Sequence, residues 1–509
     1  MRATNQEFFG AVRQEWTTFR SRGRITALAA AVLVTILLGL LVAFSDRSSC
    51  GAGTVEVTCP TDPVGPQGTA VSDQFFFAHR PLGSNGSITV RMTSMTGVIT
   101  YPPPNHDEIV PGLVPWAKAG VIIKDGTAQG SSYAVLAVTG SNGVRMQHDY
   151  VHDTAGRPGG VSPAAPRWLR LTRSGTTITG DESTDGVRWT EVGTAELPGL
   201  PETVQVGLFA TSPGDLTLRP TGLGASAPEV RFTQATAAFD NVTVDGAPAA
   251  GWSSDTVGEM GHTDWERYHR APGLVESNGT FTVTGSGDIG PVGTVGHHAV
   301  EDTLVGLALG LIIVIVVAVR FATGVTSLSA RLLAAKAVVI GAVAFLTGLI
   351  AAAVAVPVGT EALRAGGSGV LPVSALAELR VVVGVAALVA LAAVFAFALG
   401  ALVRRTGVAI VVAISAVVVP YILATLPLLP DDVSRRLLRL TPAAGFAVRQ
   451  TIGEFPQVVA HYAPSAGYFP LPGWAGLVVL CGYTAAVLGL VVFRLGRRAV
   501  TSAPEPAWR

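Results

Sequence analysis

Six uncharged apolar stretches constrain the fold of this 509-residue chain more than any other feature. They cover 25–44, 303–319, 337–360, 381–403, 406–430 and 473–493, and none contains Asp, Glu, Lys, Arg or His. About 20 helical residues cross the roughly 30 Å hydrocarbon layer, so each stretch predicts a membrane span, with 303–319 at the short limit. The first stretch is longer than the apolar region of a signal peptide, and we interpret it as a retained span. A charged fraction of only 14% fits a chain partly dissolved in lipid.

The orientation follows from arginine and lysine, because positive residues near a span resist translocation. With the N-terminus inside, the cytoplasmic segments carry fourteen of them, namely Arg2, Arg13, Arg20, Arg22, Arg24, Arg320, Arg331, Lys336, Arg404, Arg405, Arg494, Arg497, Arg498 and Arg509. The short outer loops carry six, namely Arg364, Arg380, Arg435, Arg436, Arg439 and Arg449. This bias predicts a multi-pass protein of the cell membrane, with 303–498 holding spans two to six. Both termini, including the tail 499–509, are then cytoplasmic, and 45–302 lies outside. The outer arginines Arg435, Arg436 and Arg439 suggest a face that contacts lipid headgroups.

Residues 1–24 precede the first span and have the pattern of an amphipathic helix. Phe8, Phe9, Val12, Trp16 and Phe19 recur at helical spacing beside a cationic side. This pattern favours an elbow helix in the membrane interface, and a cytosolic helix packed on the protein's own loops is the alternative.

Residues 45–302 have a different pattern, in which apolar positions alternate between turn residues. The pattern predicts an all-β sandwich. Eight candidate strands are Ser87–Met92, Ala117–Lys124, Tyr133–Thr139, Gly143–His148, Arg167–Arg173, Thr176–Ser183, Val204–Thr211 and Ala235–Val244. The tail 246–302 has one alternating run, Gly279–Thr284, and either completes the sandwich or forms a stalk.

The chain has three cysteines, so it can form at most one internal disulfide. Cys50 and Cys59 follow the first span, whereas Cys481 lies inside the last one. In an extracytoplasmic segment, Cys50 and Cys59 are candidates for a disulfide, and two unpaired thiols are the alternative.

Three tryptophans, Trp116, Trp168 and Trp189, could stack on sugars, but their alternating strand positions favour packing in the core. The donors His148, Asp149, His152 and Asp153 lie at a strand end and in a loop, where we interpret them as solvated polar residues and expect no metal.

Asp181, Glu182, Asp185 and Glu191 bring four carboxylates together in the sequence. Asp185-Gly186 is a turn pair, and we expect no catalytic carboxylates here.

Several β segments carry a resemblance to a known family. They are WAKAGVIIKDG (116–126), YAVLAVTGSNGVRMQ (133–147), RWLRLTRSGTTITGDESTDGVRWTEVG (167–193), VGLFATS (206–212) and ATAAFDNVTV (235–244). Together they resemble the concanavalin-A-like, laminin-G-like jelly-roll domains of bacterial secreted proteins, over about 70–245. The resemblance implies a jelly roll and carbohydrate or surface binding, with the three tryptophans as candidate glycan contacts, and it implies no catalysis.

The flanking segments carry a second resemblance. They are RQEWTTFRSRGR (13–24), RLLAAKAVVIGAVAFLTGLIAAAVAV (331–356), RRTGVAIVVAISAVVVPYILATLPLL (404–429), LLRLTPAAGFAV (437–448) and PLPGWAGLVVLCGYTAAVLGLVVFRLGRR (470–498). They resemble permease subunits of bacterial ABC exporters of the drug and polysaccharide type. The loop 321–330 is shorter than usual there and lacks the acidic residue that commonly meets the ATPase.

The exporter resemblance implies a separate cytosolic ABC ATPase, because this chain has no G-x-x-x-x-G-K-[ST] phosphate loop. The spans also lack the ionisable groups that ion-coupled carriers use. ATP and Mg would then belong to the partner, and this chain would bind no cofactor and be no enzyme itself. The expected coupling residues are Glu15, Trp16, Arg20, Arg320, Arg331 and Lys336.

The exporter reading includes pairing as a homodimer or with a homologous permease. The alternative function is a membrane-anchored, lectin-like protein that binds or senses envelope glycans without transport. A net charge of zero gives no reason to expect nucleic acid.

Overall fold

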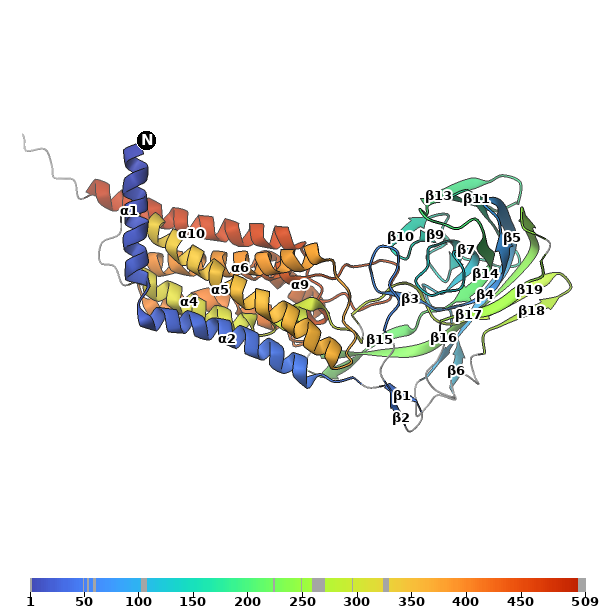
Figure 1. The fold of residues 1–509 in the computed structure, drawn as a ribbon, viewed down its shortest axis with the longest axis horizontal. Coiled ribbons are helices and arrows are strands. Elements are labelled where there is room, and N and C mark those ends of the chain that lie inside the picture. Colours follow the sequence, from blue (N-terminus) through green and yellow to red (C-terminus); the bar gives the residue numbers. More distant parts are fainter. Residues whose placement is uncertain are drawn as a thin grey trace, which may run out of the picture.

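The computed structural model describes residues 2–48, 50–52, 55–57, 61–101, 108–222, 225–248, 250–258, 271–294, 296–323 and 329–501. A helical bundle forms one half of the molecule and a β domain the other (Figure 1). Helix α1 (Arg2–Phe19) crosses the far end of the bundle, where α10 (Gly473–Thr501) also ends. Both described termini therefore lie at the end of the bundle opposite the β domain.

Five helices of the described chain are long and apolar enough to cross a membrane. They are α2 (Arg22–Ser45), α5 (Ala330–Ala365), α6 (Ala375–Val403), the pair α7 (Thr406–Val417) and α8 (Val419–Thr425), and α10. The expected span 303–319 is shifted toward the C-terminus, to the apolar helix α4 (Leu307–Thr323), whose 17 residues make it shorter than these five. Residues 300–304 form a separate 3-10 turn, η1 (Val300–Leu304), in which the carboxylate of Asp302 accepts a hydrogen bond from the Ala299 amide at 2.9 Å.

Two other expected boundaries differ for local reasons. The span expected over 406–430 breaks near Val418 and ends at Thr425, because Pro420 has no amide to donate and Pro427 and Pro430 follow. In contrast, α5 begins before the expected Ala337, at a cap where Ser329 Oγ accepts a hydrogen bond from the Leu332 amide at 3.2 Å. The segment between α8 and α10 holds α9 (Asp431–Leu440), η2 (Pro442–Arg449) and η3 (Pro464–Ala466).

Close helix packing in the bundle depends on small residues. Gly306 and Gly310 let α4 approach α2 at Thr35, where a Cβ on either glycine would clash. Helix α6 lies at the centre and buries most of its residues, whereas α2 and α10 bury only a minority of theirs. The outer surfaces of α2 and α10 are therefore available to lipid.

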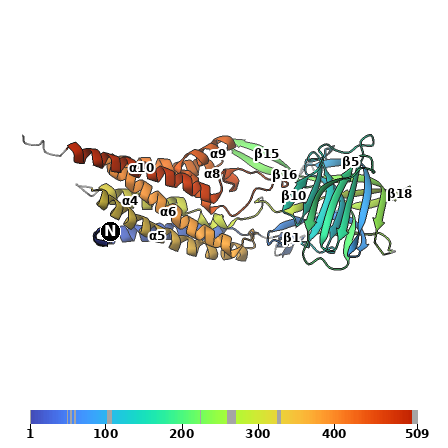
Figure 2. The ribbon, with the colours of Figure 1, turned by 90° about the horizontal axis from the view of Figure 1, so that it is seen from above.

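The β domain is a sandwich of two antiparallel sheets, seen edge-on in Figure 2. The seven-stranded sheet has the order β10 (His152–Ala155), β9 (Val144–His148), β8 (Tyr133–Thr139), β7 (Lys118–Lys124), β14 (Val204–Thr211), β4 (Phe75–Leu82) and β17 (Ser253–Val257). The path of the nine-stranded sheet is β13 (Thr190–Glu196), β12 (Thr177–Ser183), β11 (Arg167–Ser174), β5 (Asn85–Thr100), β16 (Ala225–Asp245), β19 (Thr280–Gly285) and β18 (Gly273–Ser277). Off this path, β6 (Ile109–Pro111) pairs with β5 and β15 (Asp215–Gly222) with β16.

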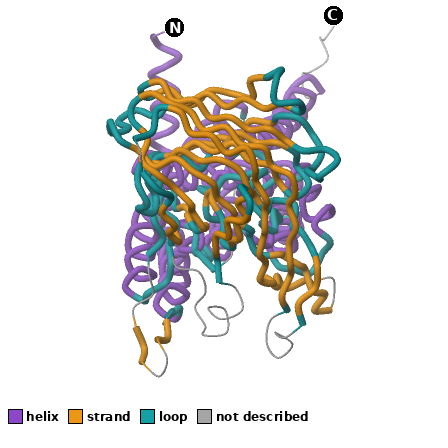
Figure 3. The backbone as a smooth tube through the Cα atoms, turned by 90° about the vertical axis from the view of Figure 1, so that its right-hand side faces the viewer, coloured by secondary structure: helices purple, strands orange, loops and turns teal. Residues whose placement is uncertain are grey.

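All eight candidate strands correspond to strands of this sandwich. The run Gly279–Thr284 lies at β19, which pairs with β16 and β18, so this part of the tail completes the sandwich. Two short pairs complete the domain, β1 (Cys50–Ala52) with β2 (Val55–Val57), and β3 (Val71–Asp73) with β20 (Ile289–Pro291). Seen from the β-domain end, the strands lie in front of the helices (Figure 3).

Both faces of the seven-stranded sheet are covered, which the alternating pattern did not predict. Every residue of β7 and of β8 is buried. Val121 and Ile123 face the core between the sheets, whereas Ile122 faces a second apolar cluster. That cluster includes Val71 of β3 and Ile289 of β20, which lie in the chain segments leading from and to the helical bundle. The second face of this sheet therefore joins the domain to its two linkers.

Candidate functional site

The end of the bundle opposite the β domain collects most of the residues expected to couple to a partner. Glu15 of α1 and Lys336 of α5 form an ion pair of 2.6 Å, and both side chains are at most one-tenth exposed. The Lys336 ammonium also lies 4.1 Å from the centre of the Phe321 ring of α4. These contacts fix the elbow helix to the start of α5 and the end of α4.

An aromatic contact reinforces this junction. The Phe19 and Phe321 rings meet edge to face at 5.1 Å, and the Arg24 guanidinium lies within 6 Å of both ring centres. Phe19 belonged to the expected amphipathic pattern of the elbow. Phe321 was missed, because it was placed in the loop that follows the expected span 303–319, whereas α4 continues to Thr323.

The structure divides the six expected coupling residues into two groups. Glu15 and Lys336 are buried and bonded to each other, so neither is free to contact a partner directly. Trp16, Arg20, Arg320 and Arg331 are exposed and form what we call the elbow surface. Of these, Trp16 stacks on Phe19 at 6.4 Å, and Arg331 makes a 2.7 Å ion pair with Glu7. The loop 324–328 lies outside the described residues.

The three tryptophans are not in the core, so that interpretation was wrong. Each is partly exposed and has an arginine over its ring: Arg145 over Trp116 at 5.3 Å, Arg91 over Trp168 at 5.9 Å and Arg170 over Trp189 at 4.2 Å. Leu169 and Leu171 of β11 fill the sandwich core instead, which turns Trp168 and Arg170 outward. The alternation of side chains along a strand does not show which of the two alternating sets of side chains faces the core.

The four carboxylates have structural partners. Asp181 pairs with Arg170 at 3.1 Å, Glu182 accepts the Arg157 amide at 2.7 Å, and Glu191 accepts the Thr194 hydroxyl at 3.1 Å. Asp185 accepts the amides of Val187 and Arg188, and these hydrogen bonds hold the pKa of Asp185 well below its usual range. Asp185 therefore organises the turn that sequence analysis expected. The proposed disulfide stays a prediction, because Cys59 and the side chain of Cys50 lie outside the described residues.

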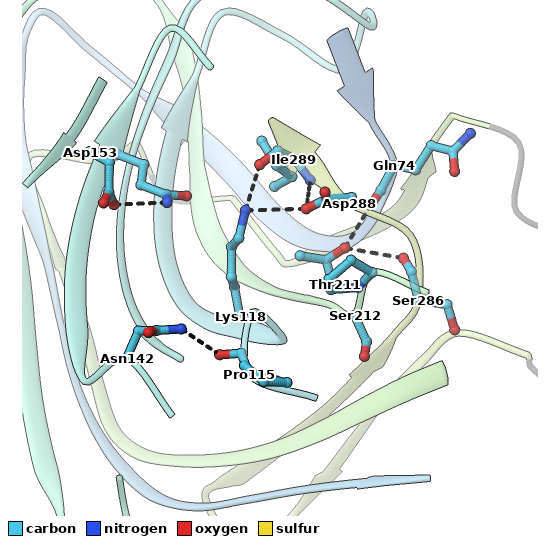
Figure 4. A network of polar contacts seen from close by, with 12 residues as sticks. Gln74, Pro115, Lys118, Asn142, Asp153, Thr211, Ser212, Ser286, Asp288 and Ile289 are labelled. Carbon is cyan, nitrogen blue, oxygen red and sulfur yellow. Dashed lines mark hydrogen bonds and ion pairs between the residues drawn. The ribbon is translucent and has the colours of Figure 1, made fainter. Parts of the chain in front are cut away.

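Buried charges on the second face of the seven-stranded sheet fix both linkers. Lys124 makes a 2.7 Å ion pair with Asp73, and the Tyr150 hydroxyl donates to the same carboxylate oxygen at 2.7 Å. Lys118 reaches Asp288 at 3.2 Å and donates to the Ile289 carbonyl at 2.6 Å (Figure 4). Burial lowers the pKa of Lys124, although Asp73 opposes this shift. The domain is thus tied to its incoming linker by Asp73 and to its outgoing linker by Asp288.

Two ionisable groups are buried at the β-domain end of the bundle: Arg449, from a predicted outer loop, and Glu301, from the end of the segment 45–302. The Arg449 guanidinium donates to the Tyr421 hydroxyl at 2.8 Å and to the Leu304 carbonyl at 3.3 Å. Glu301 accepts hydrogen bonds from both the amide and the hydroxyl of Thr451, and burial raises the pKa of Glu301. These contacts join the segment around Arg449 and Thr451 to η1 and α8 at the β-domain end of the bundle.

The histidine pair of the β9–β10 hairpin is directly cross-strand. The rings of His148 and His152 stack at 4.3 Å, and His152 lies 2.7 Å from the Gln67 amide nitrogen. Asp153 pairs with Arg145 at 3.0 Å instead of joining the histidines. Among the described residues, no group of three or more His, Cys, Asp or Glu side chains could hold a metal.

The stability of the β domain should decrease in mild acid because of His148. Burial, followed by repulsion from His152, lowers the pKa of His148 from its ordinary 6.5 to about 4. The folded state therefore favours the neutral ring, and this contribution is complete above pH 6.5 and is lost as the pH falls toward 4. Thermal unfolding of the domain, followed from neutral to mildly acidic pH, should show a flatter pH dependence for His148→Gln than for the parent. Equal dependence in both proteins would remove His148 as the cause.

Comparison with known proteins gives no family for this chain. No protein-family model and no curated protein matches it. Among solved structures, scytalido-glutamic peptidase with a transition-state analogue matches at 9% identity and a TM-score of 0.27, over 44% of this chain and 100% of that chain. SCP-B of the eqolisin peptidase family matches at 8% identity and a TM-score of 0.25, over 43% of this chain and 100% of that chain. A functionally unknown protein from Saccharomyces cerevisiae matches at 15% identity and a TM-score of 0.22, over 38% of this chain and 85% of that chain. Similarity this low carries no argument about activity. The chain has a β-sandwich and five long apolar helices, which suggest a multi-pass membrane protein.

Proposed function

We propose that this chain is the membrane subunit of an ATP-driven ABC export system. In this proposal α4 is the second of six spans, both termini are cytoplasmic and the sandwich is an extracytoplasmic jelly roll. A separate cytosolic ATPase subunit binds ATP and Mg and docks on the elbow surface. The permease pairs with a second copy or a homologous chain, so that two such surfaces meet two ATPases.

The observation that carries the proposal is the buried Glu15–Lys336 ion pair. It makes α1 a rigid lever on α5, while Trp16 and Arg20 stay exposed for a partner. A cytosolic protein that pushes the elbow surface would then move the bundle as a rigid body, because α1 is fixed to α5 and not attached through a flexible tail.

Helix α5 can carry such a movement through the bundle. It runs from Ala330 beside the elbow to Ala365, and the Gly366 carbonyl just beyond it accepts the amide of Ser48 in the incoming linker at 3.1 Å. The Gly369 carbonyl accepts the amide of His298 in the outgoing linker at 2.8 Å. ATP-driven motion at the elbow is thereby connected to the two linkers of the β domain.

The partly exposed tryptophans favour glycan binding as a second candidate function. An aromatic ring with an arginine over one face can still offer its other face to a sugar. This reading keeps the lectin-like alternative, in which the bundle is an anchor and the chain transports nothing.

The experiment that separates the two functions is purification of the full chain from its native host in mild detergent. An ATPase subunit should be recovered with it, and Trp16→Ala with Arg20→Glu should lower that recovery by about tenfold or more, as expected for a tryptophan at the centre of an interface. Neither residue has an ion pair among the described residues, so the fold should persist. The matched control is Arg436→Glu, an exposed charge reversal at the opposite end of the bundle. Recovery of the chain without any ATPase would favour the lectin-like anchor.

A further inference from the structure

A polar cavity of about 560 Å³ opens at the β-domain end of the bundle. Its lining brings together three arginines from two helices, Arg380 of α6 with Arg435 and Arg439 of α9. Arg435 and Arg439 are four residues apart, so they project from the same side of α9. Residues 450–454 and 468–473 line the rest of the cavity.

The cavity has an excess of positive charge. Glu454 is the one carboxylate in its lining, and the described residues include no ion pair between Glu454 and any of the three arginines. The nearby Asp431 is engaged by His461 at 2.8 Å. Three guanidinium groups therefore face a space with one opposing carboxylate.

Two of the arginines are oriented by the backbone. Arg380 donates to the Gln450 carbonyl at 2.6 Å, and Arg435 donates to the Tyr462 carbonyl. Each contact uses one of the five N–H donors of a guanidinium and leaves the others for a ligand. Arg439 is exposed, and its side chain makes no hydrogen bond or ion pair with the described residues. A planar guanidinium can donate to two oxygens of one anion. Several guanidinium groups around one space therefore suit a phosphate, which offers more acceptor oxygens than a single carboxylate.

The surroundings of the cavity are apolar and exposed. Leu376 lies one turn before Arg380 on α6 and is 76% exposed, and Leu440 follows Arg439 and is 69% exposed. Trp474, next to Gly473 of the cavity wall, is 72% exposed at the start of α10, and tryptophan is typical of the membrane–water interface. A ligand here would have its charged group among arginines and its apolar part beside these side chains.

We propose that this cavity binds the phosphate of an anionic phospholipid headgroup, whose acyl chains lie along α6 and α10. The site goes beyond the proposed export function, because it requires neither ATP nor a transported substrate. Arg436 of the same helix does not line the cavity, so an arginine-rich helix alone does not define the site.

The test is native mass spectrometry of the detergent-solubilised full chain with dioleoyl-phosphatidylglycerol, dioleoyl-phosphatidylcholine or inorganic phosphate. Phosphatidylglycerol should be retained over phosphatidylcholine, and Arg439→Gln should weaken that retention by about tenfold, the effect of one lost charge-assisted hydrogen bond. Arg436→Gln is the matched control and should retain the lipid as the parent does. The exposed Arg439 side chain makes no hydrogen bond or ion pair with the described residues, so its replacement should leave the thermal unfolding of the chain unchanged.

Three results would count against parts of the proposal. Equal weakening by Arg436→Gln and Arg439→Gln would show general attraction to the basic helix and overturn the site. Retention that neither variant changes would also overturn it. Inorganic phosphate that binds in an Arg439-dependent way, with phosphatidylglycerol retained no better than phosphatidylcholine, would support the phosphate site and overturn its lipid source.

Discussion

Replacing Asp73 with alanine is expected to destabilise the β domain by about 3–5 kcal/mol, because it leaves the Lys124 ammonium buried without its carboxylate. Both side chains are fully buried, and the same carboxylate oxygen also accepts hydrogen bonds from the Tyr150 hydroxyl and the Gly130 amide. The loss would be measured as a lower urea midpoint for proteolysis of the detergent-solubilised full chain within the β domain.

Two variants separate this buried pair from charge loss in general. Arg188→Ala removes an ion pair with Asp185 in which the arginine is 89% exposed, and it should cost only about 0–1 kcal/mol. Asp73→Leu combined with Lys124→Met removes both charges and should recover much of the loss, because a buried ion pair often contributes little over apolar side chains. A midpoint unchanged by Asp73→Ala would contradict the role given to this pair.

The sequence was most informative about secondary structure, which depends mainly on residues close together in the chain. The eight candidate strands correspond to observed strands, and the apolar stretches lie within or close to observed helices, because alternation and length are local properties. The errors lie at ends set by single residues, such as the break near Pro420 and the 3-10 turn around Asp302. Helix ends depend on caps and prolines, which hydropathy does not register.

Which face of a helix or strand is buried was less predictable, because burial depends on the other elements that pack against that face. Lys118 and Lys124 are charged residues within an apolar strand, yet both are buried, since β3 and β20 bring carboxylates over the sheet from chain segments far away in the sequence. The same limit explains the tryptophans, whose strands were expected and whose outward direction was not.

For the candidate coupling site, the sequence proposed six residues but did not predict which of them are buried and which are exposed. Lys336 and Arg331 looked equivalent as cytoplasmic positive charges. Lys336 turns into the junction toward Glu15, whereas Arg331 stays exposed with Glu7, and only packing against α1 distinguishes the two. Reversal of the charge on Lys336 would therefore test the elbow's attachment before it tests docking.

Glu15→Ala is expected to release the elbow helix from the bundle. The substitution leaves Lys336 buried beside Phe321 without a carboxylate, and the cost of about 3 kcal/mol or more corresponds to roughly hundredfold faster local opening. Hydrogen exchange of the amides in the second half of α1 should accelerate by that factor in the full chain, while β7 and β8 exchange as in the parent.

A charge-swapped protein, Glu15→Lys with Lys336→Glu, restores an opposite pair and should recover most of the protection, which a simple loss of side-chain volume would not explain. The matched control is Arg331→Ala, which removes the Glu7 pair between α1 and α5, an ion pair whose side chains are both about half exposed or more, and should change exchange little. If α1 exchanges equally in Glu15→Ala and the parent, other contacts hold the elbow helix, and the ion pair cannot be what makes α1 a lever on α5.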